Sequence, residues 1–486
     1  MTTLRSPTRL RAELLAGLVV ALALIPEAIA FSVIAGVDPR VGLFSSVTMA
    51  ITIAIAGGRP AMISAATAAV ALVVAPVAHE HGLSYLVATI ILAGVFQMLL
   101  AMVGVAKLMR FIPRSVMIGF VNALAILVLV SQLPHLLGVP WLVYPLTAAG
   151  IAIMVVLPKV MTAVPAPLVV VLVLTAAVIG FGWHVPDVGA QGALPHSLPI
   201  PSLPDIPVTW ATIRIIAPYA AGAALVGLLE SLMTAKLVDD LTDTPSNKTR
   251  EAGGQGIANI VTGIFGGMGG CAVIGQTMMN VKVAGGRTRL STFFTGGFLL
   301  LLIVSLGDLV GRIPMAALAA VMIMVSVATF DWHSVAPRTL KVLPRSETLI
   351  MVVTVFATVG TGNLAIGVSL GVLTAMVAFA RRVAHLTTVE SDHQPGVDDG
   401  GTRTYRVRGE LFFASSNDLV HQFDYANDPD DVLIDMSDTD IWDASSVAAL
   451  DAVRGKYHAR GKTVRLTGLD GASLERLNRL SGRLGM

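Results

Sequence analysis

Long apolar runs separated by short polar joints fill the first 385 residues of this 486-residue chain. A helix needs about 20 apolar residues to cross the hydrocarbon core of a bilayer, and several of these runs are shorter. Two of the short runs follow glycine-rich breaks, GGRP (57–60) and FGGMGG (265–270). Interrupted helices of this kind are tolerated where they line a cavity inside the protein. We predict fourteen membrane segments, near 14–35, 41–57, 63–77, 83–105, 114–132, 141–157, 165–182, 210–236, 253–266, 272–284, 289–309, 314–330, 346–361 and 363–385.

The pattern changes beyond residue 385. A polar, glycine-containing stretch at 386–401 predicts a linker, and strands and helices then alternate. This alternation predicts a small α/β domain over 402–486. We expect its strands at 403–409, 431–437 and 462–469, and its helices at 415–426, 445–460 and 472–480.

Basic residues in the joints indicate the orientation. The long joint at 183–209 contains no lysine or arginine, whereas joints on the opposite side, such as 338–345 and 381–382, are basic. By the positive-inside rule, the N-terminus is cytoplasmic. An even number of spans then places the α/β domain in the cytoplasm as well, and we expect a multi-pass protein of the cell (inner) membrane.

Two lone carboxylates lie within apolar runs. Glu27 is in the first predicted segment and Glu230 is in the eighth, and each precedes one of the two glycine-rich breaks. Fourteen segments therefore divide into two halves of seven, about 10–183 and 208–385. Because seven is odd, the halves run in opposite directions, which predicts an inverted repeat with its binding site near the bilayer midplane.

This symmetry suggests an anion site. The two short helices, 65–77 and 272–284, would bring their N-terminal ends together, and helix N-termini bind anions without help from lysine or arginine. A carboxylate inside a membrane is a functional-site hypothesis by default, so Glu27 and Glu230 are candidate proton-coupling groups. The alternative for Glu27 is a structural hydrogen bond to backbone released by Pro26.

Composition narrows the class of protein. The chain is 55% hydrophobic and only 13% charged, against roughly 25% charged residues in soluble domains. Its basic residues are scattered, which argues against nucleic-acid binding, and the lone Cys271 allows neither an internal disulfide nor a thiolate metal cage. Catalytic and nucleotide-binding motifs are missing, so we expect neither an enzyme nor an ATP-driven pump, and no cofactor.

Several stretches resemble the sulfate permease (SulP) family of anion transporters and exchangers. They are AGVDPRVGLFSS (35–46), LLESLMTAKLVDDLTDT (228–244), REAGGQGIANIVTGIFGGMGG (250–270) and QTMMNVKVAGGRTRLS (276–291). The tail resembles the sulfate transporter and anti-sigma factor antagonist (STAS) domain that usually follows. The resemblance implies a core domain that moves against a gate domain in an elevator-like way, and a homodimer.

The resemblance also implies which residues form the site. Glu27 stands where the family usually has Gln, and this second acid favours proton coupling. Many animal and plant relatives have Arg at the position of Gln276, so its absence makes sulfate or chloride a less obvious cargo. Some bacterial members of this kind move dicarboxylates such as fumarate with protons. The implied substrate-binding residues are Glu27, Phe31, Thr67, Ala68, Gly275 and Gln276, and the implied residues for the coupling ion are Glu230 and Thr234.

A purely structural role is the alternative for several of these residues. Thr67 and Thr234 could bond only to their own helices, and Cys271 is expected to be a small apolar filler. In the tail, DASSV (443–447) resembles the loop where anti-sigma antagonists are phosphorylated, with Ser445 as the candidate regulatory position and Ser446 as its alternative. A purely structural helix start, capped by Asp443 or Ser445, is favoured there.

The sequence thus predicts a secondary anion transporter that cotransports protons with a small carboxylate. A sodium-coupled carrier of bicarbonate or sulfate is the alternative, and an anion channel or exchanger is an alternative of a different class. A membrane sensor is disfavoured, because the tail carries no kinase, nucleotide-binding or DNA-binding motif.

Overall fold

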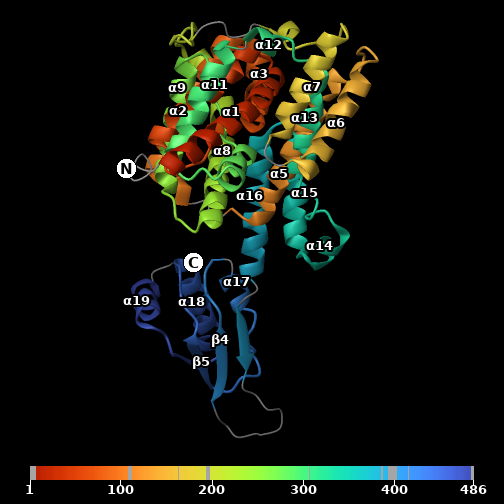
Figure 1. Cartoon of the computed structure of the whole chain (residues 1–486). Helices are drawn as coiled ribbons and strands as arrows, with labels where there is room; N and C mark the ends of the chain where they lie inside the picture. Colours follow the sequence, from red (N-terminus) through yellow and green to blue (C-terminus); the bar gives the residue numbers. More distant parts are fainter. Residues whose placement is uncertain are drawn as a thin grey trace. The chain divides into compact units, whose positions relative to one another are not determined.

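A computed structural model describes residues 7–107, 112–161, 164–192, 198–305, 307–384, 387–391, 402–413 and 415–482. The chain divides into two compact units, Met1–Val372 and Leu373–Met486. In Figure 1 the first unit runs in colour from red to green, and the second unit is blue. Each unit is described by itself below.

The first unit is helical, and each of the fourteen predicted segments contains a helix. Within the described residues, seven helices are long and apolar enough to cross a membrane, and four further apolar helices are shorter. The helices are α1 (Pro7–Ala35), α2 (Pro39–Ala56), α3 (Ala68–His81), α4 (Leu83–Val103), α5 (Arg114–Val130), α6 (Val143–Val160), α7 (Ala166–Gly180), α8 (Trp210–Thr242), α9 (Lys248–Ile264), α10 (Ile274–Met278), α11 (Arg289–Ser305), α12 (Gly307–Gly311), α13 (Met315–Thr329), α14 (Pro337–Val342), α15 (Arg345–Thr361) and α16 (Leu364–Ala384), which continues into the second unit.

Two groups of helices are visible within the first unit (Figure 1). In one group, α1 and α2 pack against α11, and α4 packs against α8 and α9. In the other group, α5 packs against α13 and α15, and α6 packs against α7 and α13. Glycines allow the closest approach in the first group, because a Cβ on Gly256 of α9 would lie 2.6 Å from the Gly94 carbonyl oxygen of α4. This division corresponds to the expected core and gate domains.

The two interrupted segments meet through a short antiparallel ladder. Strand β1 (Ser64–Ala65) pairs with β2 (Cys271–Ala272), in the register Ser64 to Ala272 and Ala65 to Cys271. Because the strands are antiparallel, α3 and α10 leave the ladder in opposite directions, as an inverted repeat requires. Gly270 must be a glycine, since a Cβ there would lie 1.9 Å from the Ala65 carbonyl oxygen.

The structure corrects the two predicted short helices. The first begins at Ala68, with Thr67 as its N-cap, and not at residue 65. The second is not one helix over 272–284: after β2 comes the five-residue α10, followed by a π-helical turn, Met279–Val283. The first residues of both segments are extended because they pair with each other, which a two-residue pattern cannot reveal. Isolated π-turns are frequent at functional sites.

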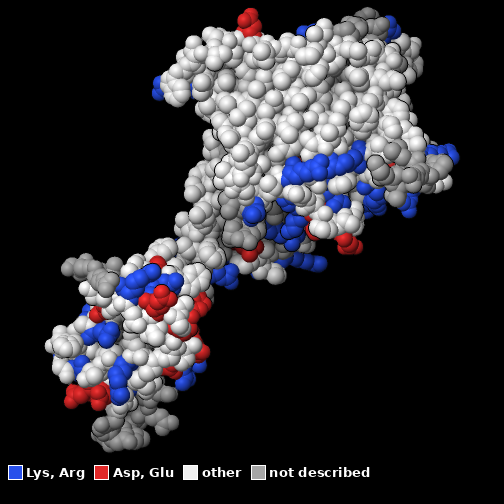
Figure 2. Space-filling view, turned by 90° about the vertical axis from the view of Figure 1, so that its left-hand side faces the viewer, with Lys and Arg blue, Asp and Glu red and all other residues white. Residues whose placement is uncertain are grey.

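On one face of the first unit, charged side chains are rare over the broad middle of the surface (Figure 2). On the face shown in Figure 2, lysine and arginine gather along one rim, and the wide surface above them is almost free of charge. A band of this kind suits contact with lipid, since charged groups within the hydrocarbon region are costly.

The second unit contains a four-stranded sheet. Its strands are β3 (Thr388–Ser391), β4 (Arg403–Arg408), β5 (Asp431–Asp438) and β6 (Thr463–Thr467), in the order β3-β4-β5-β6. Strand β3 pairs antiparallel with β4, and the other two pairs are parallel. The helices are α17 (Ser416–Leu419), α18 (Ala444–His458) and α19 (Gly471–Leu480). The alternating buried side chains of β5, such as Val432, Ile434 and Met436, face the core that α18 covers.

Two predictions for the tail are wrong in part. The expected linker at 386–401 contains the edge strand β3, whose pairing with β4 fixes it despite its polar sequence; residues 392–401 lie outside the described residues. The expected helix at 415–426 is helical only over Ser416–Leu419. Beyond it, the Asp424 side chain bonds the Asn427 backbone N–H at 3.2 Å, and such local side-chain bonds compete with helix formation.

Candidate functional site at the β1–β2 ladder

Glu230 of α8 reaches the start of α3 through a cysteine. The Glu230 side chain is buried, and the Cys271 thiol of β2 donates to its Oε2 at 3.0 Å. The same sulfur lies 3.1 Å from the Thr67 hydroxyl oxygen. That oxygen also accepts the Val70 backbone N–H at 3.4 Å, which makes Thr67 the N-cap of α3. A carboxylate, a thiol and a capping hydroxyl therefore form one hydrogen-bonded chain.

Glu27 of α1 lies beside α10 in the same way. The residue is 6% exposed, and its carboxyl lies beside the Gln276 side chain. Among the described residues, the Gln276 Oε1 atom is buried without a hydrogen-bond partner. Gly275 borders open space, since a Cβ added there would meet no atom within 4 Å. The contacts thus cross between the repeats: Glu27 of the first meets Gln276 of the second, and Glu230 of the second reaches Thr67 of the first.

The remaining predicted residues surround these contacts. Ala68 is the first residue of α3, and Phe31 lies one helical turn after Glu27; both are buried. The Thr234 hydroxyl donates to the Glu230 backbone carbonyl at 2.7 Å, so in this structure it bonds to its own helix. Ser445 belongs to the second unit and is exposed, while Asp443 is the N-cap of α18 and accepts the Ser446 backbone N–H.

Sequence reasoning missed the polar role of Cys271 and of its supports. Cys271 is buried, as expected of a filler, but its thiol bridges two site residues. Ser231 and Asn259 hold the backbone on either side of it. Its position directly after the FGGMGG break was the available signal, because the residue that follows such a break enters the ladder.

The site holds no cation of its own. Within the described residues, Arg59 is the one basic side chain that is buried, and it is committed elsewhere. Polar groups at the site are two carboxyls, a thiol, a hydroxyl, an amide and the first N–H groups of α3. These groups can hold an anion through hydrogen bonds and the helix dipole, provided that the two carboxyls do not both carry charge.

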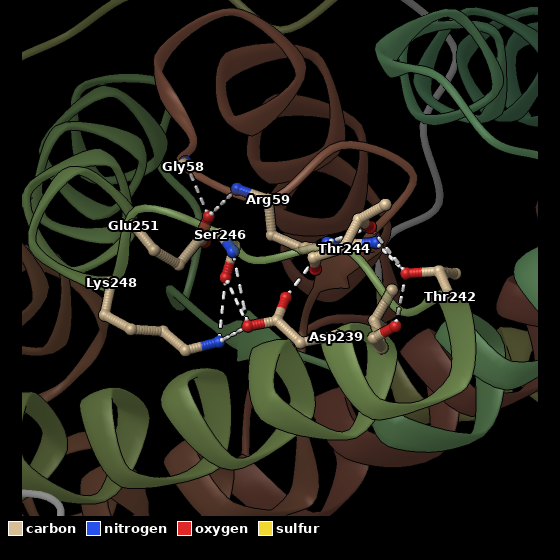
Figure 3. Close-up of polar contacts among 9 residues, drawn as sticks. Gly58, Arg59, Asp239, Thr242, Thr244, Ser246, Lys248 and Glu251 are labelled. Atoms are coloured by element: carbon tan, nitrogen blue, oxygen red, sulfur yellow. Dashed lines mark hydrogen bonds and ion pairs between the residues drawn. The ribbon is translucent and has the colours of Figure 1, made fainter.

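Arg59 belongs to a charge cluster near the end of α8, shown in Figure 3. The Arg59 guanidinium donates to Asp239 Oδ1 at 2.9 Å and to the Thr242 and Thr244 hydroxyls. Lys248 binds Asp239 Oδ2 at 2.5 Å. Glu251 accepts the backbone N–H groups of Gly58 at 2.7 Å and Arg59 at 2.8 Å. The cluster fastens the GGRP break to α8 and α9.

A helical membrane unit with interrupted, inverted segments and a small α/β domain defines a membrane transporter and not an enzyme. The profile of the Sulfate permease family matches residues 10–147 and 142–354, and that of the STAS domain matches residues 389–481. The chain therefore belongs to the sulfate permease family and carries a STAS domain.

Two relatives cover nearly the whole chain. YbaR of Bacillus subtilis (strain 168), provisionally named a sulfate transporter, is 50% identical over 464 residues, which are 96% of this chain and 95% of YbaR. The bicarbonate transporter BicA of Picosynechococcus sp. (strain ATCC 27264 / PCC 7002 / PR-6) is 26% identical over 520 residues, covering 97% of this chain and 91% of BicA.

Solved structures show the same fold. The transmembrane domain of a cyanobacterial BicA superposes with a TM-score of 0.67 at 26% identity, covering 74% of this chain and 98% of that domain. SLC26A9 superposes with a TM-score of 0.81 over 96% of this chain and 86% of its own, at 17% identity. The fold class predicted from the sequence, a polytopic helical transporter with a C-terminal STAS domain, is confirmed.

Proposed function

We propose that this member of the sulfate permease family is a secondary active transporter that carries a small anion together with protons. The observation that carries the proposal is the pair Glu27 and Glu230, two buried carboxyls that border the start of the interrupted helices and have no basic partner among the described residues. An anion entering between two charged carboxylates would be repelled. Protonation of one or both removes that repulsion, so anion binding and proton uptake favour each other.

A small carboxylate, in particular a dicarboxylate such as fumarate, is the proposed cargo. The groups available to bind it are N–H and hydroxyl donors, which suit carboxylate oxygens. The second candidate is sodium-coupled transport of bicarbonate or sulfate. The names of BicA and YbaR favour these two anions, because those relatives are named for bicarbonate and sulfate. Exchange, or channel-like conduction, is the alternative of a different class.

Alternating access is proposed to be elevator-like. The helices that pack around α1, α2, α8 and α9 would move as one core against the group around α5 and α13. We also propose a homodimer in the cell (inner) membrane, with the N-terminus and the STAS domain in the cytoplasm. The transport domain would comprise residues 1–385 with repeats over about 10–183 and 208–385, and the STAS domain residues 402–486, with Ser445 as a regulatory position.

Uptake into proteoliposomes tests the proposal. Labelled fumarate, bicarbonate and sulfate are offered separately, with and without an inward proton gradient, while potassium clamps the voltage. Accumulation of fumarate driven by the proton gradient is the expected result. Accumulation of bicarbonate or sulfate that needs sodium would establish the second candidate instead. Flux that only dissipates a gradient of the anion itself, whatever the cation, would contradict coupled transport.

A further inference from the structure

Cys271 occupies an unusual place in this site. Its sulfur touches Glu230 on one side and Thr67 on the other, at 3.0 and 3.1 Å. It is fully buried, and it is the single cysteine of the chain. A small apolar filler would need neither contact, and together the two contacts join Glu230 of the second half of the membrane unit to Thr67 of the first.

The backbone around Cys271 is held on both sides. Asn259 accepts the Gly270 N–H at 2.9 Å and donates to the Gly270 carbonyl at 3.1 Å. The Ala272 N–H donates to the Ser231 hydroxyl at 3.0 Å. The ladder with β1 fixes the residue from a third direction. The Cys271 backbone therefore cannot shift without breaking several buried hydrogen bonds, and the thiol can leave its two partners only by rotating about the Cα–Cβ bond.

The protons available to this chain of groups allow two arrangements. An ionised carboxylate only accepts hydrogen bonds, whereas a thiol and a hydroxyl each donate one proton and accept others. With Glu230 ionised, the thiol proton points at the carboxylate, and the Thr67 hydroxyl gives its proton to the sulfur. With Glu230 protonated, the carboxyl donates a hydrogen bond to the sulfur, and the thiol donates its own hydrogen bond to the Thr67 oxygen. The Thr67 proton is then free to bind another acceptor.

We propose that Cys271 is a positioning residue that relays the protonation of Glu230 to the Thr67 hydroxyl, which then donates to the transported anion. The inference rests on the proposed function, since it assigns the coupling proton to Glu230. One proton passes from solution to the Glu230 carboxylate, and the thiol and hydroxyl protons only reorient, so no bond to sulfur is made or broken. Anion binding gains a donor at the moment when the negative charge disappears.

Few other ionisable groups face this chain from the elements packed on α8. Helix α10 presents the neutral Gln276, behind which lies Glu27 of α1. Helix α4 presents the neutral Gln97, which bonds Asn259 of α9. Other ionisable groups of these helices are near their ends. They are Tyr85 at the start of α4, Lys248, Arg250 and Glu251 at the start of α9, and His79, Glu80 and His81 at the far end of α3; Glu251 is committed to Gly58 and Arg59. Glu27 is therefore the matched control for Glu230.

Infrared spectroscopy of the full-length protein tests the relay without knowledge of the cargo. The S–H stretch absorbs where other protein groups do not, and a single cysteine gives a single band. Acidification should move the band to higher frequency, because the thiol exchanges a charged acceptor for a weaker neutral one. Glu230→Gln should abolish this pH-dependent shift, and Glu27→Gln should retain it. A wild-type band that ignores pH, or a shift that survives Glu230→Gln, would overturn the relay.

Transport gives a second readout. Cys271→Ser keeps a donor and an acceptor in place, so the pH dependence of KM should persist. Cys271→Ala removes the acceptor that holds the Thr67 proton while Glu230 is ionised, so this proton is free at every pH. The ratio of KM at neutral pH to KM at acidic pH should therefore shrink roughly fivefold, the effect of one hydrogen bond, while the maximal rate is retained. Equal KM profiles in the two variants would contradict the relay. Absence of proton-driven uptake by the wild type would instead contradict the proposed function, and the infrared band would still decide the relay.

Discussion

Two groups of acids in the same membrane unit have opposite surroundings. In the charge cluster, Asp239 is bonded to Arg59 and Lys248, and Glu251 accepts two backbone N–H groups and the Gln255 amide. At the ladder, Glu230 meets a thiol, and Glu27 meets a side-chain amide. Both groups border a glycine-rich break. Glu251 is buried like Glu27 and Glu230, so between these three acids the difference lies in the partners and not in the depth of burial.

The comparison separates a structural role from a functional one. An acid that is paired with cations and N–H groups is held in place by them, and losing one partner of a buried pair costs about 3–5 kcal/mol. Such a cluster is suited to fixing the GGRP break against α8 and α9. An acid that faces only neutral groups can gain and lose a proton without breaking an ion pair. The pair at the ladder is therefore suited to coupling.

The largest expected effect comes from making Glu230 permanently neutral. We expect Glu230→Gln to abolish accumulation driven by a proton gradient, because the coupling group can no longer change charge, while thermal unfolding in detergent stays close to that of the wild type. Uptake with and without the gradient measures the first effect. Wild-type uptake with an intact pH response in this variant would remove Glu230 from the mechanism.

A comparably large effect on stability, and not on coupling, is expected at Arg59. Arg59→Ala leaves Asp239 with Lys248 and Ser246 and removes the guanidinium that binds the Thr242 and Thr244 hydroxyls, so we expect about 3 kcal/mol of destabilisation. The temperature of unfolding in detergent measures it. Arg59→Lys is the matched control: it keeps the charge but loses the planar fork, and should be intermediate. If Arg59→Ala unfolds like the wild type, the cluster does not fix the break.

Much of this arrangement could be predicted from the sequence, for identifiable reasons. Apolar runs and glycine-rich breaks mark the membrane segments, because both depend on local composition. Lone acids in such runs, Glu27 and Glu230, stand out for the same reason. The strands β3 and β1 could not be predicted, since one is polar and the other has two residues, and each exists only through its partner strand.

The side chains that meet in the folded structure could not be predicted from the sequence either. Arg59 and Asp239 are 180 positions apart, and Thr67 and Cys271 are 204 apart. Nothing in a single sequence couples such positions. The inverted repeat predicted that the two breaks approach each other, but not which side chains would meet there. The thiol bridge and the π-helical turn after α10 therefore emerge only from the folded structure.

The smallest expected effect concerns Lys248 and compares the two cations of the charge cluster. Lys248 and Arg59 bind the same carboxylate, but the Lys248 side chain is 29% exposed and that of Arg59 is 6% exposed. Water and salt weaken a pair at the surface, so Lys248→Ala should cost about 1 kcal/mol or less and should matter less as salt is added. Unfolding temperatures at low and high salt measure this cost. A loss of stability as large as that of Arg59→Ala, and insensitive to salt, would show that Lys248 belongs to the buried part of the charge cluster. A small loss that salt screens would show that Arg59 and the backbone hydrogen bonds of Glu251 hold the GGRP break instead.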